Sequence, residues 1–324
     1  MATLVLNRNS LSVKLESEHL LIHEHADGGG FSRLPLVDVE RVVVVGQPAI
    51  SFPVLAELLD RGIPCSFLTS GGRWRGMMDG DGGFHAGRRV RQYERVNDPA
   101  FALLLSRQTV LAKISAGRRT IQRLAAERRI HLADDPDWLS LTQLKGRLSR
   151  METVEAVRGV EGMAATLYFR LLGGFFPPDA PFTGRSRRPP LDPANALLSF
   201  IYTLLTGAFT AAVRVHGLDV AGGYFHRGRD RSPALALDLM EPFRPAWADR
   251  LALDLLNHRR VRAERHFEQA DGGVYLNESG RGIVFRAFDE LMERCRKTDR
   301  GSVSCRQMID QEVCRFIALL ERDM

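Results

Sequence analysis

A glutamate stands on the apolar face of a predicted helix in this 324-residue sequence. Apolar residues recur at steps of three or four over about residues 150–172, and Glu161 falls on that stripe between Val157 and Ala164. A carboxylate in this position faces the core, where a charge is unfavourable unless it is paired or bound to a metal. Glu161 is therefore a candidate for chemistry.

The segment "GGYFHRGRDRSPALALDLMEPFRP" at 222–245 adds a histidine and two acids. His226 follows a Gly-Gly turn, and Asp238 and Glu241 are three residues apart in a predicted helix, so the two acids would share one helix face. Carboxylate oxygens suit Mg²⁺ and Mn²⁺, and an imidazole shifts the preference toward Mn²⁺. A metal held by such residues offsets charge on phosphoryl oxygens and activates a hydroxyl or a water.

The same residues also permit a purely structural interpretation. Asp238 could be an acid that the helix dipole favours in a first turn, and Glu241 could pair with Arg244 three residues later. His226 could be a structural or surface residue. Residue spacing alone does not choose between these roles and a metal site.

The elements that must position these residues predict an α+β fold. Short β-prone runs separated by Asn, Asp, Gly and Pro occupy residues 3–46, and a short helix and two further strands follow up to residue 78. From about residue 90 the helical period dominates, until "GGVYLN" at 272–277. We expect a small β-rich N-terminal domain at 1–87 and a larger, mainly α-helical catalytic domain at 88–324.

Two helices of the second part have recognisable ends. Asp192 is a suitable N-cap for a long apolar helix that stops at Gly217, and its apolar surface predicts a central core helix. Hydroxyl residues and an arginine interrupt the apolar run, which argues against a membrane span. The helix that carries Asp238 is expected to start with Ser232 as its cap, and Pro242 and Pro245 should kink or restart it.

The charge of the chain favours a polyanionic partner. The formal net charge is +6, and 41 of the 45 basic residues are arginine, which binds phosphate in a bidentate manner. Residues 85–150 contain fourteen basic and six acidic residues, and "GRSRRPP" at 184–190 forms a second basic cluster. Clustering favours nucleic acid, although GC-rich coding could produce the arginine bias and solvated faces could hold the charges.

The cysteines and the N-terminus indicate an ordinary reduced compartment. The four cysteines show no CxxC pair and no zinc spacing, so we expect them to be free. The start of the chain lacks a signal-peptide pattern, which makes cytoplasmic residence the expectation.

Four ordered motifs resemble the CRISPR-associated endonuclease/integrase family, the spacer-acquisition integrase. They are "GVEGMAATLYF" around Glu161, "RPPLDPANALLSFIYTLL" at 188–205, "HGLDVAGGYFH" ending at His226, and "SPALALDLMEPFRP" with Asp238 and Glu241. The N-terminal part is similar only in general character.

The resemblance implies specific roles for these residues. It implies a β-rich N-terminal domain used in dimerisation and a helical catalytic domain in which Glu161, His226 and Glu241 bind Mg²⁺ or Mn²⁺. Asp238 matches a second acid characteristic of the family's helix, and it is a catalytic candidate that either orients the site or serves as an auxiliary ligand. Which of Asp238 and Glu241 touches the metal stays open.

The resemblance also implies DNA as substrate. The implied partners are the spacer precursor and the CRISPR repeat, a second copy of the chain as a homodimer, and a small second adaptation protein in a heterohexameric complex, with no membrane partner. The candidate DNA-binding residues are Arg185, Arg187, Arg188, Asn195, Tyr202 and Arg244. For Asn195 and Tyr202, the sequence does not distinguish a DNA contact from a packing role.

The implied activity is metal-dependent insertion of spacer DNA into the CRISPR array by attack of a 3′-hydroxyl on a phosphodiester. Two alternatives remain. One is a metal-dependent nuclease that acts on branched or single-stranded DNA in repair, and the other is a non-catalytic DNA-binding subunit.

Overall fold

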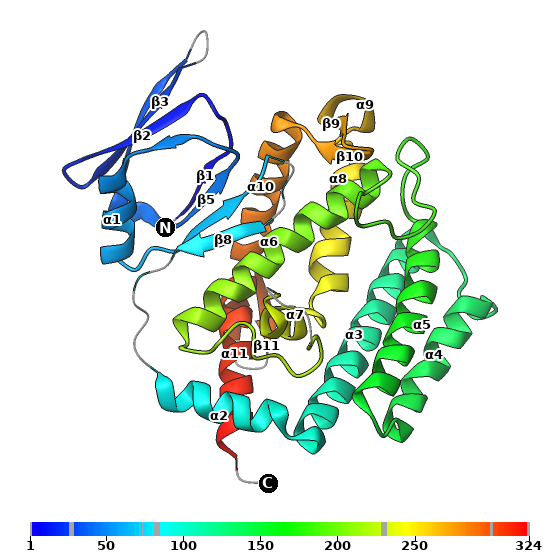
Figure 1. Ribbon diagram of the computed structural model, residues 1–324. Helices are drawn as coiled ribbons and strands as arrows, with labels where there is room; N and C mark the ends of the chain where they lie inside the picture. The colour runs from blue at the N-terminus through cyan, green and yellow to red at the C-terminus, as the bar shows by residue number, and fades with distance from the viewer. Residues whose placement is uncertain are drawn as a thin grey trace.

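The N-terminal part of the chain forms two four-stranded sheets (Figure 1). The computed structural model describes residues 2–25, 29–70, 72, 74–78, 80, 85–227, 232–298 and 301–322. One sheet has the order β1-β5-β7-β8, in which β1, β5 and β7 are parallel and β8 is antiparallel to β7. The other has the order β4-β3-β2-β6. The elements are β1 (Ala2–Leu6), β2 (Leu11–Glu16), β3 (His19–Glu24), β4 (Phe31–Pro35), η1 (Leu36–Asp38), β5 (Val39–Val45), β6 (Ala49–Ile50), α1 (Phe52–Asp60), β7 (Cys65–Leu68) and β8 (Trp74–Met78).

Strand β5 ends in four consecutive valines, Val42–Val45, because both faces of this half of the strand are buried. Successive strand residues point to opposite faces. Val42 and Val44 belong to the core between the two N-terminal sheets, whereas Val43 and Val45 belong to the core of the helical part. The sheet that contains β5 therefore lies between the other sheet and the helices, and "VVVV" is the sequence expected of a strand in that position.

The helical part begins at α2 and contains two small hairpins. Its elements are α2 (Ala86–Asn97), α3 (Pro99–Arg128), α4 (Pro136–Arg147), η2 (Leu148–Arg150), α5 (Val154–Gly173), α6 (Pro193–Val215), α7 (Ala234–Met240), the π-helical turn η3 (Pro245–Asp249), α8 (Arg250–Asn257), α9 (Ala263–His266), β9 (Phe267–Ala270), β10 (Gly273–Leu276), α10 (Glu278–Glu293), β11 (Cys295–Thr298), β12 (Gly301–Ser304) and α11 (Cys305–Glu321). The predicted α+β class is confirmed, while the domain boundary at residue 87 stays a prediction.

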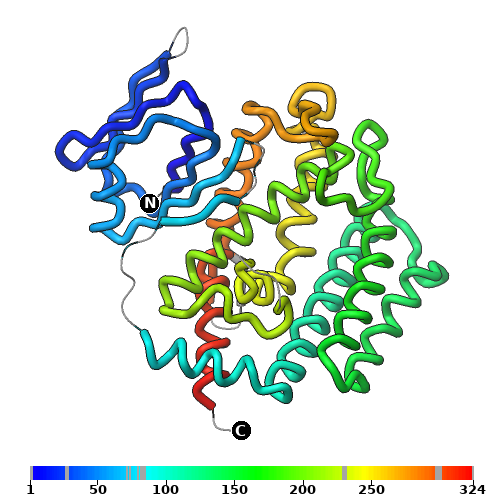
Figure 2. The backbone as a smooth tube through the Cα atoms, in the orientation of Figure 1, coloured from blue at the N-terminus to red at the C-terminus, as the bar shows by residue number. Residues whose placement is uncertain are grey.

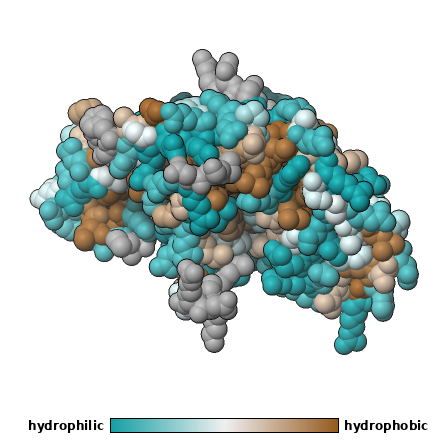
Figure 3. Space-filling model, turned by 90° about the horizontal axis from the view of Figure 1, so that it is seen from below, coloured by the Kyte–Doolittle hydropathy of each residue, from teal (hydrophilic) through white to brown (hydrophobic). Residues whose placement is uncertain are grey.

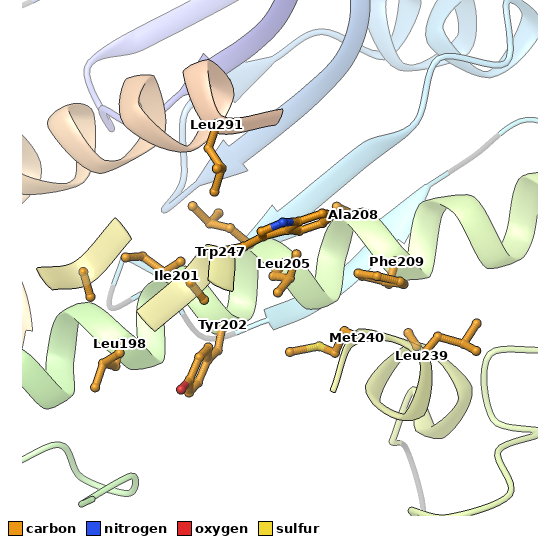
Figure 4. Close-up of a cluster of buried hydrophobic side chains, with 14 of the residues drawn as sticks. Leu198, Ile201, Tyr202, Leu205, Ala208, Phe209, Leu239, Met240, Trp247 and Leu291 are labelled. Atoms are coloured by element: carbon orange, nitrogen blue, oxygen red, sulfur yellow. The ribbon is translucent and has the colours of Figure 1, made fainter. Parts of the chain in front are cut away.

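Helix α6 runs through the centre of the helical part. Asp192 caps it by accepting a hydrogen bond from the Asn195 backbone N–H at 2.7 Å, and Gly217 follows its end with φ +72°. Figure 4 shows its side chains, such as Leu205, among those of α7, η3 and α10. Within the described ranges one helix, α6, has the length and apolarity of a membrane span, and 83% of its apolar window is buried inside the protein. Its apolar surface is used for packing, as the sequence predicts for a core helix.

The helices that carry the candidate residues differ slightly from expectation. Helix α5 begins at Val154, after the predicted 150, because the Thr153 hydroxyl caps it by accepting from the Ala156 N–H at 3.1 Å. The predicted cap Ser232 is wrong, since Pro233 precedes α7 and provides no side-chain cap. The predicted restart near the prolines is confirmed, because α7 ends at Met240 and η3 begins at Pro245.

Long helices meet in two places that matter for the site. Helices α3 and α5 lie side by side (Figure 1), and a Cβ at Gly117 of α3 would lie only 3.0 Å from the Tyr168 ring of α5. Helix α11 lies against α2 (Figure 2), where Arg91 donates to the Leu320 carbonyl at 3.2 Å. Cys65, Cys295, Cys305 and Cys314 form no disulfide, as predicted. The face drawn in Figure 3 is mainly hydrophilic, with hydrophobic residues in separate patches.

We predict that Leu205→Ala lowers the free energy of unfolding by about 2–5 kcal/mol, because it opens a cavity around the central helix. Leu205 is fully buried in α6. The matched control on the same helix is Val215→Ala, which is 60% exposed and should change stability by less than about 0.5 kcal/mol. Urea denaturation measures both, and equal losses would contradict the central position of α6.

Candidate active site

Helix α5 carries Glu161 at the edge of its buried stripe. Val157, Ala164 and Tyr168 of this stripe are buried, whereas the Glu161 side chain is 24% exposed. The Glu161 carboxylate pairs with the ammonium group of Lys113, which comes from the neighbouring helix α3. The acid therefore lies between the core and solvent, where it can meet a substrate.

Glu241 approaches the same ammonium group from the bend after α7. Its side chain is 3% exposed, Lys113 Nζ lies 2.7 Å from Glu241 Oε2, and an Arg244 N–H donates to Oε1 at 2.6 Å. Burial alone raises the pKa of Glu241, but the charges of Arg244, Lys113 and His226 outweigh it and hold that pKa well below its ordinary value. Glu241 is therefore ionised at neutral pH.

Asp238 organises the loop that ends at His226. Its fully buried carboxylate accepts hydrogen bonds from the backbone N–H groups of Tyr224, Phe225 and His226 at 2.7, 2.9 and 2.9 Å. It also lies 2.7 Å from His226 Nδ1. A neutral His226 ring held in this way carries its proton on Nδ1 and leaves the Nε2 lone pair free for a ligand.

The glycine at position 223 allows the loop to lie close against the Asp238 carboxylate. A Cβ at Gly223 would lie 2.7 Å from Asp238 Oδ2 and 2.7 Å from the Ala234 Cβ, so a larger residue would push the loop off the carboxylate. Arg158 of α5 adds a second hold, since its Nε donates to the Phe225 carbonyl at 3.1 Å. The ring of Phe316 from α11 stacks on Tyr224 with centroids 5.9 Å apart.

Three of the four catalytic candidates thus face one another. His226 Nε2 lies 3.8 Å from Glu241 Oε1, and Glu161 and Glu241 share the Lys113 ammonium. Asp238 lies behind His226. Across the described part of the chain, no three His, Cys, Asp or Glu side chains stand in an arrangement ready to hold a metal, since the ammonium lies between the two glutamates.

The donor set nevertheless fits a divalent cation. Two carboxylates and an imidazole nitrogen are oxygen and nitrogen donors of the kind that Mg²⁺ and Mn²⁺ accept. Glu241 Oε2 is buried and has no hydrogen bond of normal geometry, although it pairs electrostatically with Lys113. A metal that binds this oxygen would take the place of the Lys113 ammonium.

A third buried acid, Asp249, supports the arginine of the site. Its carboxylate accepts from the Tyr168 hydroxyl at 2.7 Å and from the Tyr202 hydroxyl. Burial raises the pKa values of both tyrosines, so their hydroxyls stay protonated and donate. The guanidinium of Arg244 lies 4.0 Å from the centre of the Tyr202 ring. This stack fixes Arg244, which also binds Glu241.

Sequence reasoning missed Asp249 and Lys113. Asp249 follows an apolar run with Trp247, and an acid there is the same signal that identified Glu161. Lys113 is one of four lysines among 45 basic residues, on a helix whose other cations are arginine. Each was detectable as an exception to the pattern around it.

The candidate DNA-binding residues separate into buried and exposed groups. Asn195 is fully buried, and its amide group bonds to Asp192, Gly184, Ser186 and Arg185. Tyr202 is 9% exposed and bonds to Asp249. Their geometry favours the packing role of the two roles that the sequence left open. Arg187 and Arg188 are exposed.

An open cavity of about 490 Å³ adjoins the acidic cluster. Its lining includes Lys113, Glu161, Tyr202, Arg187 and Arg244. A carboxylate and two arginines in one lining, among apolar residues such as Leu141 and Phe169, suit a phosphate beside a metal. A second cavity of about 580 Å³ lies between the β1-β5-β7-β8 sheet and helices α6 and α10, and none of the candidate residues lines it.

Comparison with known proteins identifies the family. The family described as "CRISPR associated protein Cas1" matches residues 4–290. The chain belongs to the Cas1 family. The predicted family is thereby confirmed, and the match covers all four catalytic candidates but ends before α11.

Two curated relatives agree with this assignment. "CRISPR-associated endonuclease Cas1 3" of Thermus thermophilus is 37% identical over 261 residues, which are 80% of this chain and 76% of the relative. "CRISPR-associated endonuclease Cas1 2" of Rhodospirillum rubrum is 36% identical over 310 residues, which are 91% and 87% of the two chains.

Solved structures of Cas1 proteins share the fold. A Cas1 protein from Thermotoga maritima has a TM-score of 0.82 at 25% identity, covering 99% of this chain and 97% of that one. A casposase bound to integration product has a TM-score of 0.89 at 19% identity, covering 99% and 90%. A chain of a Cas6-RT-Cas1–Cas2 complex has a TM-score of 0.82 at 23% identity, covering 98% of this chain and 35% of that one. The latter two show similarity of fold.

We predict that Asp238→Asn destabilises the protein and disturbs His226. The new amide NH₂ cannot accept from the N–H groups that Asp238 now satisfies, and each buried donor left unpaired costs about 1–3 kcal/mol. Urea denaturation measures the loss, and ¹⁵N NMR of the histidine ring shows whether His226 loses its Nδ1–H form.

The matched control is Asp254→Asn, because Asp254 is a 39% exposed acid paired with Arg250. The Asp254→Asn variant should lose less than about 1 kcal/mol of unfolding free energy. Similar losses in the two variants, with the His226 tautomer unchanged, would contradict the orienting role of Asp238.

Proposed function

We propose that this Cas1 protein is a metal-dependent DNA integrase that inserts spacer DNA into a CRISPR array. The observation that carries the proposal is the convergence of Glu161, His226 and Glu241 beside a cavity lined by arginines. Its Cas1 family membership supports a role in spacer integration, and relatives named endonucleases support phosphodiester chemistry.

Glu161, His226 and Glu241 would hold Mg²⁺ or Mn²⁺. When bound there, the ion would supply Lewis-acid stabilisation of phosphoryl charge and lower the pKa of a hydroxyl or water. Between the two acids that the sequence left open, Glu241 is the proposed ligand, because Asp238 already uses both oxygens on the loop and the histidine. Asp238 orients the His226 ring.

The remaining residues bind and orient the DNA backbone. Arg244 is fixed by Glu241 and by the Tyr202 ring, so it presents charge to the cavity at little entropic cost. Arg187 reaches the same cavity from the loop before α6. Arg185 bonds to Asn195 and Ser199 and supports that loop, which makes it a positioning residue.

The proposed reaction is a transesterification. The 3′-hydroxyl oxygen of the incoming strand forms a bond to the phosphorus of a phosphodiester at the repeat boundary, and the bond from that phosphorus to the existing 3′-oxygen breaks. The hydroxyl proton leaves the attacking oxygen, and the departing 3′-oxygen gains a proton. Water in place of the 3′-hydroxyl gives hydrolysis, which is the endonuclease activity for which the relatives are named.

The proposed partners follow from neighbours of the same fold. DNA is favoured by the casposase bound to integration product, and a small second adaptation protein is favoured by the complex that contains Cas2. A homodimer through the β-rich part is supported by its exposed apolar residues Phe31, Val37, Phe52 and Leu59. We also propose that the chain and the second adaptation protein assemble into a heterohexamer. The proposed location is the cytoplasm, where the DNA substrate is found.

We predict that Glu161→Gln, His226→Ala and Glu241→Gln each lower strand transfer by at least about a hundredfold, because each removes a metal ligand. The assay supplies a DNA fragment with a free 3′-hydroxyl, a CRISPR-repeat target, the second adaptation protein and Mg²⁺ or Mn²⁺. Joined and cleaved products are separated on a denaturing gel.

The controls are Glu155→Gln, an acid 76% exposed on the same helix as Glu161, and His258→Ala, an exposed histidine. Both should keep wild-type rates. Wild-type rates in the ligand variants would refute the site. Cleavage without joining by the wild-type protein would favour the repair nuclease. If a chelator left the DNA activities and the Tm of the wild type unchanged, the non-catalytic subunit would be favoured.

We predict that Arg187→Ala weakens DNA binding and lowers the slope of log affinity against log salt by about 1, because one phosphate contact is lost. Fluorescence anisotropy over a salt series measures both quantities. Arg259→Ala is the control, since Arg259 is 71% exposed and does not line the cavity. Equal slopes for the wild type and the Arg187 variant would exclude this contact.

A further inference from the structure

The Lys113 ammonium occupies the middle of the candidate metal site. It pairs with Glu161 on one side and lies 2.7 Å from Glu241 Oε2 on the other. These are two of the three proposed ligands, and they come from different elements, α5 and the bend after α7. The lysine side chain is only 17% exposed, so this ion pair is a largely buried contact between α3 and α5.

The protein needs a cation at this point when no metal is bound. The Glu241 carboxylate is 3% exposed and lies between two cationic side chains, and removing one partner of a buried ion pair is strongly destabilising. Arg244 neutralises one oxygen of Glu241 from its own side, while Lys113 faces the other oxygen and Glu161. Lys113 thus provides the positive charge that a divalent ion would otherwise provide.

The choice of lysine matters because the other basic residues of helix α3 are arginines. An arginine between two carboxylates would hold them through a rigid, multiply bonded guanidinium fork, whereas a lysine offers one compact ammonium on a flexible stem. Lysine is therefore the basic residue that is easier to displace. The displaced group has space available, because Lys113 also lines the cavity that Arg187 and Tyr202 share.

We propose that Lys113 is an internal counter-ion that holds the metal-free site together and competes with the metal for Glu161 and Glu241. The proposal rests on the metal site of the proposed function. On metal binding, the ammonium leaves the two carboxylates and turns into the cavity, where it becomes a further cation for the DNA phosphates. Metal affinity is thereby set partly by the strength of the lysine contacts.

The test measures metal binding and stability without DNA. Mn²⁺ affinity is obtained by titration calorimetry, and Tm is measured with and without Mn²⁺, for the wild type, Lys113→Met, Lys113→Arg and Lys145→Met. Lys145 is an exposed lysine on α4 and serves as the matched control. Glu161→Gln is included to show that the binding measured is at this site.

We expect Lys113→Met to lower the Tm of the metal-free protein, to bind Mn²⁺ at least about tenfold more tightly than the wild type, and to gain more Tm from the ion. Lys113→Arg should retain the metal-free Tm and bind Mn²⁺ at least about tenfold more weakly. Lys145→Met should match the wild type. The arginine variant keeps the test decisive if the methionine variant does not fold.

Two outcomes overturn the inference, and they can be told apart. If the wild type binds Mn²⁺ through Glu161 but both Lys113 variants bind it with the same affinity, Lys113 is no competitor and the proposed function is unaffected. If the wild type binds no Mn²⁺, or Glu161→Gln binds it equally well, the metal site itself fails and this inference fails with it.

Discussion

Negative charge buried in an apolar helical core is the constraint around which the catalytic part of this protein is organised. Asp238, Glu241 and Asp249 are 0%, 3% and 1% exposed, and each is stabilised by a different kind of partner. Asp238 is satisfied by backbone and imidazole N–H groups, and Asp249 by two tyrosine hydroxyls. Glu241 is satisfied by the side-chain charges of Lys113 and Arg244. A side-chain cation of this kind is the partner that the proposed metal would replace.

These differences explain why two acids three residues apart have separate tasks. Asp238 is in α7 and faces the loop, where neutral N–H donors surround it. Glu241 is the residue after the helix, at the bend, and points toward cations. Glu241 keeps helical backbone angles at the end of α7, so both acids stay on one face, and His226 lies against both. The sequence identified the pair, whereas the partners that the loop and α3 contribute give the two acids their separate tasks.

Sequence patterns predicted local features well where local physics governs them. The caps and stops of α6, the stripe of α5 and the strand β5 follow from side-chain periodicity and from Asp, Pro and Gly at element ends. Strand β9 was missed because its mostly exposed residues show no apolar alternation. Lys113 and Asp249 were missed for another reason. Their roles depend on neighbours that are distant in sequence, and no local pattern records which helix will pack against α3 or α8.

The distance in sequence between the parts of the site has a consequence for the cell. Glu161, His226 and Glu241 are brought together by packing of α3, α5, α7 and the loop between α6 and α7, and the loop is backed by Phe316 of the last helix. A nascent chain on the ribosome carries Glu161 long before the residues that complete its surroundings exist. The candidate site is therefore assembled only with the finished tertiary structure.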